Sequence, residues 1–502
     1  MKKSILISAL ALLLSAAPGF AQVEKILDEG INNNQTMNYL DVLSNRFGGR
    51  LLGSGAYEDA ANWCEYMFKS WGVEVIRQEC GELPVGFNRG PWFGKMIGGS
   101  GESLHFATPS YTAGTKGVQR GTVVKEPLTT ADFEKMKGTM KGAWVLINGE
   151  SSGFPIDFSA SADSLRAIDI AYNDSLARAS RGPRGGAAEG VKFRKTPALF
   201  YKQMVEAGIL GIIQSSSDPI RALYDRKNLM NMTFETLPTI PDIKLDERQY
   251  KKIEEMVDHR EYLLLEFDIR NHFRMGPVKY HNIIGVIRGS KYPNEYVMCG
   301  GHLDAYDVAT GGVDCGSGAT VALEAARLIA KTGVKPKRTI LFCLWAGEEF
   351  GLWGSKYFVE NCKYLDKISN YFNRDGGPTI PTGITVPEAM YDDFVNVCKP
   401  LQGKFDFEVR KRQGEPRPRP TSAGGSDHAY FAMNGVPTLG FDQGDPLGYN
   451  FNYGEIWHTD RDLYNKSIPE YQEACSTITA VTLWGLANLN HNLDRKGLYK
   501  DE

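Results

Sequence analysis

The chain has 502 residues, of which 42% are hydrophobic and 23% are charged, and its formal net charge is −3. This composition is ordinary for a globular protein and excludes a disordered or fibrous chain. The mildly acidic balance argues against nucleic acid as a partner. By length alone we expect about two to four domains.

The first 21 residues resemble an export signal. Lys2 and Lys3 form a short positive region, residues 5–14 are apolar, and small residues precede Gln22. This pattern is typical of a signal peptide, with cleavage expected before Gln22. No later segment has the roughly 18 uninterrupted apolar residues of a membrane span. We therefore expect a periplasmic or secreted protein with no membrane span.

Residues 36–76 are predicted to form a helix, a turn and a second helix that leads into a strand. Apolar residues recur at helical spacing between Ala56 and Trp71, and Val73–Ile76 is a short strand-like run. The Gly-rich stretch 48–55 predicts a loop before the second helix.

Residues 109–270 have a different character. Short apolar runs, such as 143–147 and 208–214, alternate with Gly- and Ser-rich stretches, and residues 178–195 are basic and Gly-rich. No set of residues with catalytic or metal-binding spacing falls here. We interpret the segment as an inserted β-rich domain whose basic stretch is an exposed loop.

The pattern becomes a regular alternation of strands and helices after residue 276. Strands are predicted at 283–287, 296–299, 339–345 and 436–441, and helices at 317–331 and 477–489. This alternation predicts an α/β fold with an open, mainly parallel sheet covered by helices on both faces. The expected organisation is a signal peptide at 1–21, a discontinuous main domain at 22–108 and 271–502, and the insert at 109–270.

Several predicted strands end in potential metal ligands. The predicted strands 296–299 and 339–345 and the further run 368–372 lead into His302, Glu349 and Asp375 respectively. Because ligands bind at the carboxyl ends of the strands in open α/β sheets, these side chains are expected at one edge. Asp314 lies at the start of a helix, where an anionic side chain is favoured, and His458 lies in a late loop.

Two imidazoles and three carboxylates suit Zn²⁺. A pair of metals about 3.5–4 Å apart is held by bridging ligands, and Asp314 can bridge. One ion would take His302 and Glu349 and the other Asp375 and His458, although the sequence leaves open which ligand serves which ion.

Two further acidic residues stand beside the predicted ligands. Neighbours on a loop can point in different directions, so Glu348 can act as the general base while Glu349 binds metal. Asp304 can hydrogen-bond the imidazole of His302 and orient it. Each residue type is common alone, and only the ordered occurrence of all of them at strand ends indicates a site.

Five motifs resemble those of the M28 family of zinc peptidases. They are GHLD at 301–304, VDCGSG at 313–318, LWAGEEFGL at 344–352, GSDH at 425–428 and HTDRD at 458–462. The resemblance covers residues 36–80 and 276–490. The stretches VKPKRT, RDGG and PTG, at 334–339, 374–377 and 381–383, are more similar to the carboxypeptidase Q branch of that family.

The resemblance implies a phosphorylase/hydrolase-like three-layer α/β sandwich, with a mixed, mainly parallel sheet, that binds two zinc ions. It implies exopeptidase activity on short peptides, as an aminopeptidase, dipeptidase or carboxypeptidase, and it makes a homodimer one expected state. It implies that the insert corresponds to a protease-associated domain. It assigns metal binding to His302, Asp314, Glu349, Asp375 and His458, and catalysis to Glu348 and Asp304.

Some features depart from this pattern or leave alternatives open. Cys315 stands where many relatives have Asn or Asp, and we expect its thiol to point away from the metals. A disulfide between Cys64 and Cys80 is one option for an exported chain. The alternatives to a peptidase are a glutaminyl cyclase-like acyltransferase, which works with one zinc, and a binding protein without metal. The sequence does not distinguish amino-end from carboxyl-end specificity.

Overall fold

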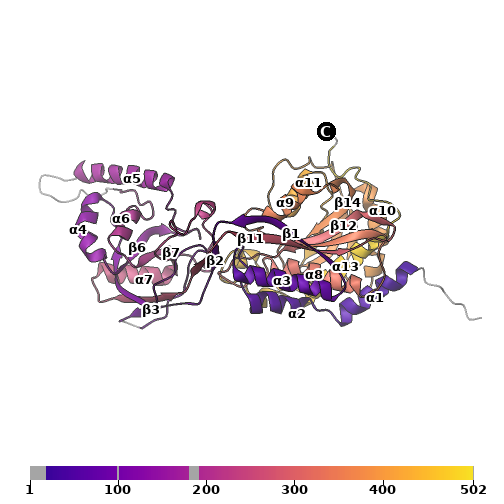
Figure 1. The fold of residues 1–502 in the computed structure, drawn as a ribbon, viewed down its shortest axis with the longest axis horizontal. Helices are drawn as coiled ribbons and strands as arrows, with labels where there is room; N and C mark the ends of the chain where they lie inside the picture. The colour runs from indigo at the N-terminus through magenta and orange to yellow at the C-terminus, as the bar shows by residue number, and fades with distance from the viewer. Residues whose placement is uncertain (1–17, 99–100, 180–191, 501–502) are drawn as a thin grey trace, which may run out of the picture.

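The computed structural model describes residues 18–98, 101–179 and 192–500. Two lobes lie side by side along the long axis of the molecule (Figure 1). The main lobe contains a five-stranded sheet, and the second lobe, residues 92–269, contains a seven-stranded sheet. Most of the predicted signal peptide, residues 1–17, lies outside the described residues. Within the described part, no helix is both long and apolar enough to cross a membrane.

The main sheet is mixed, as predicted. Its order is β1-β11-β13-β12-β14. The bounds are Glu74–Leu83 for β1, Val278–Ile287 for β11, Arg338–Trp345 for β13, Tyr292–His302 for β12 and Ile368–Asn373 for β14. β12 is parallel to both β13 and β14, whereas β11 is antiparallel to β1 and β13. Every residue of β13 is buried, which explains why it reads as a continuous apolar run.

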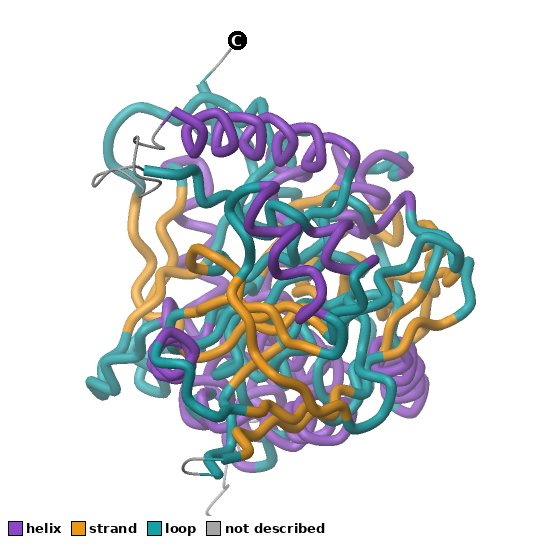
Figure 2. The backbone as a smooth tube through the Cα atoms, turned by 90° about the vertical axis from the view of Figure 1, so that its left-hand side faces the viewer, coloured by secondary structure: helices purple, strands orange, loops and turns teal. Residues whose placement is uncertain are grey.

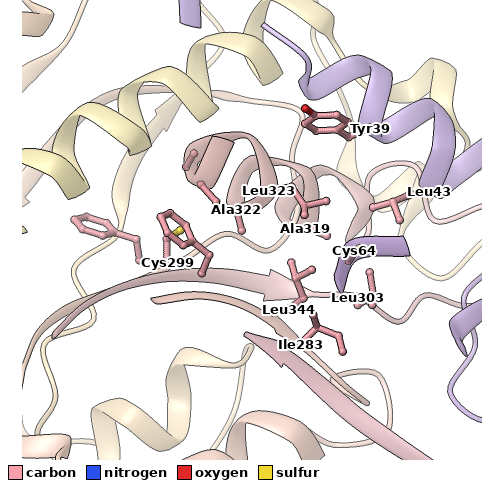
Figure 3. Packing of buried hydrophobic residues seen from close by; sticks show 14 of the residues in the cluster. Tyr39, Leu43, Cys64, Ile283, Cys299, Leu303, Ala319, Ala322, Leu323 and Leu344 are labelled. Carbon is pink, nitrogen blue, oxygen red and sulfur yellow. The ribbon is translucent and has the colours of Figure 1, made fainter. Parts of the chain in front are cut away.

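Helices cover both faces of this sheet and complete three layers (Figure 1). On one face, strand residues Ile283, Cys299 and Leu344 pack toward Ala319 and Leu323 of α8 (Figure 3). The helices of the main lobe are α1 (Pro18–Asn32), α2 (Thr36–Leu40), α3 (Gly55–Ser70), α8 (Gly316–Ala330), α9 (Trp353–Asn361), α10 (Tyr391–Cys398), α11 (His428–Met433), α12 (Tyr453–Ile456) and α13 (Pro469–Asn488). On the other face, β13 packs against α9 and α11. The predicted α/β sandwich is therefore confirmed.

One predicted strand of the main lobe is wrong. Residues 436–440 form no strand, and β17 (Phe441–Gly444) begins where the predicted strand would end. Pro437 has no N–H to donate to a ladder, and its carbonyl instead accepts a bond from the amide of Tyr371 at 2.9 Å. β17 belongs to a small sheet with β15 (Ile380–Val386) and β16 (Glu408–Lys411).

The second lobe contains a seven-stranded sheet, together with helices that were not predicted from the sequence. The sheet order is β3-β9-β5-β6-β7-β8-β4, with β3 at Trp92–Ile97, β4 at Phe106–Ala107, β5 at Gln119–Lys125, β6 at Ala143–Glu150, β7 at Gly211–Ser216, β8 at Asp242–Asp246 and β9 at Leu264–Ile269. Its helices are α4 (Thr130–Met140), α5 (Ala160–Ala179), α6 (Tyr201–Glu206) and α7 (Glu247–Asp258). Figure 2 views the molecule from the side of this lobe, with helices above the strands. Most of the predicted basic loop, residues 180–191, lies outside the described residues.

The two lobes are joined in more than one place. Strands β2 (Gly86–Asn88) and β10 (His272–Arg274) pair as an antiparallel ribbon between them. In addition, Ile220, Leu223 and Tyr224 of the second lobe are buried within the hydrophobic core of the main lobe. The domain limits predicted at 108/109 and 270/271 stay predictions.

Candidate metal centre

The carboxyl ends of three neighbouring strands bring predicted ligands together. β12 ends at His302, β13 ends four residues before Glu349, and β14 ends two residues before Asp375. The parallel register pairs His302 with Trp345 and Gly300 with Asn373, so the three ends are level. The three side chains therefore follow strand ends at one edge of the sheet, as expected from the sequence.

The five predicted ligands form two groups that share Asp314. Nε2 of His302 lies 3.2 Å from Oδ1 of Asp314 and 3.5 Å from Oδ1 of Asp375. Nε2 of His458 lies 2.9 Å from Oε2 of Glu349 and 3.7 Å from Oδ2 of Asp314. Asp314 thus presents one carboxylate oxygen to each imidazole. These distances group His302 with Asp375 and His458 with Glu349, unlike the pairing first considered from the sequence.

Asp304 organises the site through two different groups. Its backbone carbonyl accepts a hydrogen bond from Nδ1 of His302 at 2.9 Å, whereas its carboxylate is 3.6 Å from that nitrogen. Because a carbonyl can only accept, Nδ1 carries a hydrogen, and Nε2 is the ring nitrogen that faces Asp314 and Asp375. The carboxylate of Asp304 instead accepts the amides of Glu348 and Glu349.

The site is buried and crowded with acidic groups. Burial raises the pKa of Glu349 well above its usual value, and the nearby Asp314 carboxylate raises it further. Burial also raises the pKa of Glu348. Burial lowers the pKa of His458 to about 4, so this ring is neutral and able to coordinate at neutral pH. Oε1 of Glu349 is buried and has no hydrogen-bond partner within the described part of the chain. A cluster of buried carboxyl groups with an unpaired acceptor fits a site where bound cations would stabilise the ionised forms.

Cys315 does not point away from this site, contrary to the expectation. Its sulfur lies within 4.8 Å of ligand atoms of His302 and Asp375. The thiol donates to the backbone carbonyl of Arg374 at 3.3 Å and is buried. Cys64 and Cys80 are both free thiols, so the structure contains no disulfide between them.

Two acidic residues near the site were missed from the sequence. The carboxylate of Asp462 accepts the amides of Val313, at 2.7 Å, and Asp314, at 3.2 Å, and so holds the loop before α8. Burial raises the pKa of Asp462 to about 7. Asp427, in the GSDH motif, is fully buried, and its two oxygens have no hydrogen-bond partner within the described residues. The repeated carboxylates of the HTDRD motif were the available signal for Asp462.

Sequence comparisons with known proteins match the part of the chain that forms this site. Residues 282–482, which include every predicted ligand, match the model of Peptidase family M28. Carboxypeptidase Q of Mus musculus is 24% identical over 479 residues, which are 93% of this chain and 88% of the relative.

Two solved structures share the fold over nearly the whole chain. A Peptidase M28 precursor from Shewanella amazonensis superposes with a TM-score of 0.56 at 20% identity, covering 95% of this chain and 98% of the other. The zinc aminopeptidase BSAP from Bacillus subtilis superposes with a TM-score of 0.51 at 16% identity, covering 93% and 97%.

Proposed function

We propose, from the match of residues 282–482 to peptidase family M28, that the protein is an exported exopeptidase that holds two zinc ions and hydrolyses short peptides. The observation that carries the proposal is the position of Asp314, whose two oxygens face two separate imidazoles. A single-metal enzyme does not need a carboxylate between two ligand groups. In a binding protein without metal, a buried acidic cluster would cost free energy that no bound cation offsets.

Five side chains would hold the ions. His302 and Asp375 would bind one ion, His458 and Glu349 the other, and Asp314 would bridge them. This assignment follows from the distances within each group. The unpaired Oε1 of Glu349 supports a role as ligand, because a bound cation would satisfy it.

The residues around the ions would carry the remaining chemistry. Bound zinc supplies the Lewis acidity that polarises a scissile carbonyl and acidifies water. Glu348 would take a proton from the attacking water at its carboxylate and return it to the leaving amine. Asp304 would keep Glu348 and Glu349 in place through their amides.

The relatives represent both chain-end specificities, one being named a carboxypeptidase and one an aminopeptidase. The proposal therefore covers removal of a residue from either end. A panel of free, N-blocked and C-amidated dipeptides distinguishes the two, because each block removes the charged end that one class must recognise. Homodimer formation stays a prediction, which sedimentation of the mature chain would test.

The test of the proposed function combines metal analysis with this panel. We expect two zinc ions per chain, hydrolysis of free dipeptides, loss of activity with a chelator and recovery when zinc is returned. One zinc ion together with cyclisation of N-terminal glutamine would instead favour the acyltransferase. Absence of both metal and hydrolysis would favour a binding protein.

A further inference from the structure

The second lobe reaches the metal centre through a short segment. Residues 218–224, here called the docking segment, lie between β7 and β8. Ile220 is fully buried in the core of the main lobe, and the Tyr224 ring stacks on Phe350 with centroids 4.1 Å apart. Phe350 directly follows Glu349 in the chain. The docking segment is therefore packed into the wall of the metal centre.

The docking segment pairs with the residues that follow His458. The amide of Asp460 donates to the carbonyl of Ile220 at 2.9 Å, and the amide of Ile220 donates to Oδ1 of Asp460 at 3.1 Å. Arg221 and Thr459 form an antiparallel β-bridge. The two hydrogen bonds join residues that are 240 positions apart in sequence.

Side chains extend this contact to both sides of the ligand. Oδ2 of Asp460 lies 2.7 Å from Nε2 of His105, another residue of the second lobe. The Arg461 guanidinium donates to Asp218 at 2.8 Å. On the other side of the ligand, the Arg221 guanidinium lies 4.9 Å from the centroid of the Trp457 ring. The second lobe thus contacts residues 457, 459, 460 and 461.

His458 itself has a backbone conformation that needs such support. Its φ is +59°, in the left-handed region that non-glycine residues rarely adopt. A residue in this region costs conformational free energy and persists only where its surroundings hold it. The bonds from Ile220 and His105 to Asp460, two residues further along, supply part of that support.

We propose that the second lobe positions a metal ligand: through Asp460, the docking segment holds the His458 loop so that this imidazole can reach Glu349 and Asp314. This inference rests on the proposed two-zinc function. Asp460, Ile220 and His105 are positioning residues, since they contact the loop and not the ligand atoms. Releasing the loop lets His458 relax toward ordinary backbone angles, which moves Nε2 away from Glu349. The ion held by His302 and Asp375 takes no ligand from this loop, so the two ions should respond differently.

The test uses Asp460→Ala in the full chain, with Asp460→Asn as the conservative variant. Asn keeps an acceptor for the Ile220 amide and a polar contact for His105. Arg120→Ala is the matched control, because Arg120 forms an ion pair with Glu266 inside the second lobe. Zinc content after dialysis, zinc affinity by chelator competition, and the absorption spectrum of the cobalt-substituted protein are measured beside the rate.

We expect Asp460→Ala to keep one zinc ion at wild-type affinity and to bind the other at least tenfold more weakly. Its kcat should fall with little change in KM and should recover when zinc is added in excess. Asp460→Asn should lie near wild type, and Arg120→Ala should retain both ions. A lower melting temperature without selective loss of one ion would mean a merely structural role and would overturn the proposal.

A second variant and the wild-type chain separate the possible outcomes. His105 is half-exposed, so His105→Ala should fold even where Asp460→Ala does not, and it should weaken the same single ion. If both variants hold two ions at wild-type affinity, the positioning role is wrong while the proposed function stands. If the wild-type chain itself binds no zinc and hydrolyses no peptide, the proposed function fails first.

Discussion

The carboxylate of Asp304 accepts the backbone amides of Glu348 and Glu349, at 3.1 and 3.2 Å, one on each oxygen. A single buried side chain therefore sets the position of both the proposed base and a proposed ligand. Because its backbone carbonyl also holds Nδ1 of His302, Asp304 connects the ends of β12 and β13.

This relationship predicts the effect of removing the Asp304 carboxylate. Asp304→Ala leaves two buried amides unpaired and frees the loop that carries Glu348. We expect kcat to fall by about 10–100-fold, the range found for residues that orient metal ligands. Asp304→Asn keeps one oxygen acceptor and should be less impaired. Steady-state kinetics at equal zinc content measures both variants. An alanine variant as active as wild type would show that the loop carrying Glu348 keeps its conformation without the Asp304 carboxylate.

Arg50 should be a stability determinant for the same region. It is fully buried and donates to the backbone carbonyls of Leu303, Thr310 and Gly311 in the loop before α8. Arg50→Met leaves these acceptors unpaired, which should lower the free energy of unfolding by roughly 3 kcal/mol or more. Urea unfolding measures the loss.

The matched control for Arg50 is Arg288→Ala. Arg288 is half-exposed and pairs with Glu74 at the surface, at 2.6 Å. Exposed ion pairs contribute about 1 kcal/mol or less, so this variant should unfold nearly as wild type does. An equal decrease in unfolding free energy in the two variants would mean that the hydrogen bonds of Arg50 stabilise the fold no more than an exposed ion pair does.

The second lobe should show a pH-dependent stability that originates from Glu126. Burial raises its pKa from 4.5 to about 7, although its carboxylate accepts the amides of Asn148 and Leu199. In the unfolded chain this carboxyl loses its proton at lower pH than in the folded chain. The unfolded state therefore binds fewer protons between these two pKa values, and the stability contributed by Glu126 falls as pH rises from about 4.5 to 7.

The shift in the pKa of Glu126 also sets the size of this pH effect and shows how to measure it. At about 1.4 kcal/mol per pKa unit, the loss is at most roughly 3 kcal/mol. Glu126→Gln cannot ionise, so the difference in unfolding free energy between wild type and variant should change in favour of the variant between pH 5 and pH 8. Urea unfolding at both pH values measures the difference. A constant difference would show that Glu126 titrates alike in both states.

The sequence predicted where the residues that follow strands lie better than it predicted the contacts between loops. His302, Glu349 and Asp375 could be placed because apolar runs mark β12 and β13, the run 368–372 precedes Asp375, and parallel neighbours end at one edge. A bridging role was expected for Asp314, but which carboxylate lies beside which imidazole depends on loop geometry, for which the sequence has no periodic signal. The contact between Ile220 and Asp460 could not be predicted, because Ile220 belongs to no motif and the HTDRD motif does not indicate which residue Asp460 contacts.

The neighbouring residues Glu348 and Glu349 provide the sharpest test of the site, because their proposed roles differ. Glu348→Gln keeps the shape of the side chain but cannot accept a proton. It should bind two zinc ions and fold normally, with a rate lowered by about 10²–10⁴-fold, the range for general acid–base catalysis. Glu349→Ala removes a ligand beside His458 and should lose metal as well as activity, with a lower melting temperature because bound metal stabilises the folded state.

Elemental analysis and a dipeptide assay on both variants measure these outcomes. Loss of zinc from Glu348→Gln with two ions retained by Glu349→Ala would reverse the two roles, and full activity in both would exclude the site altogether.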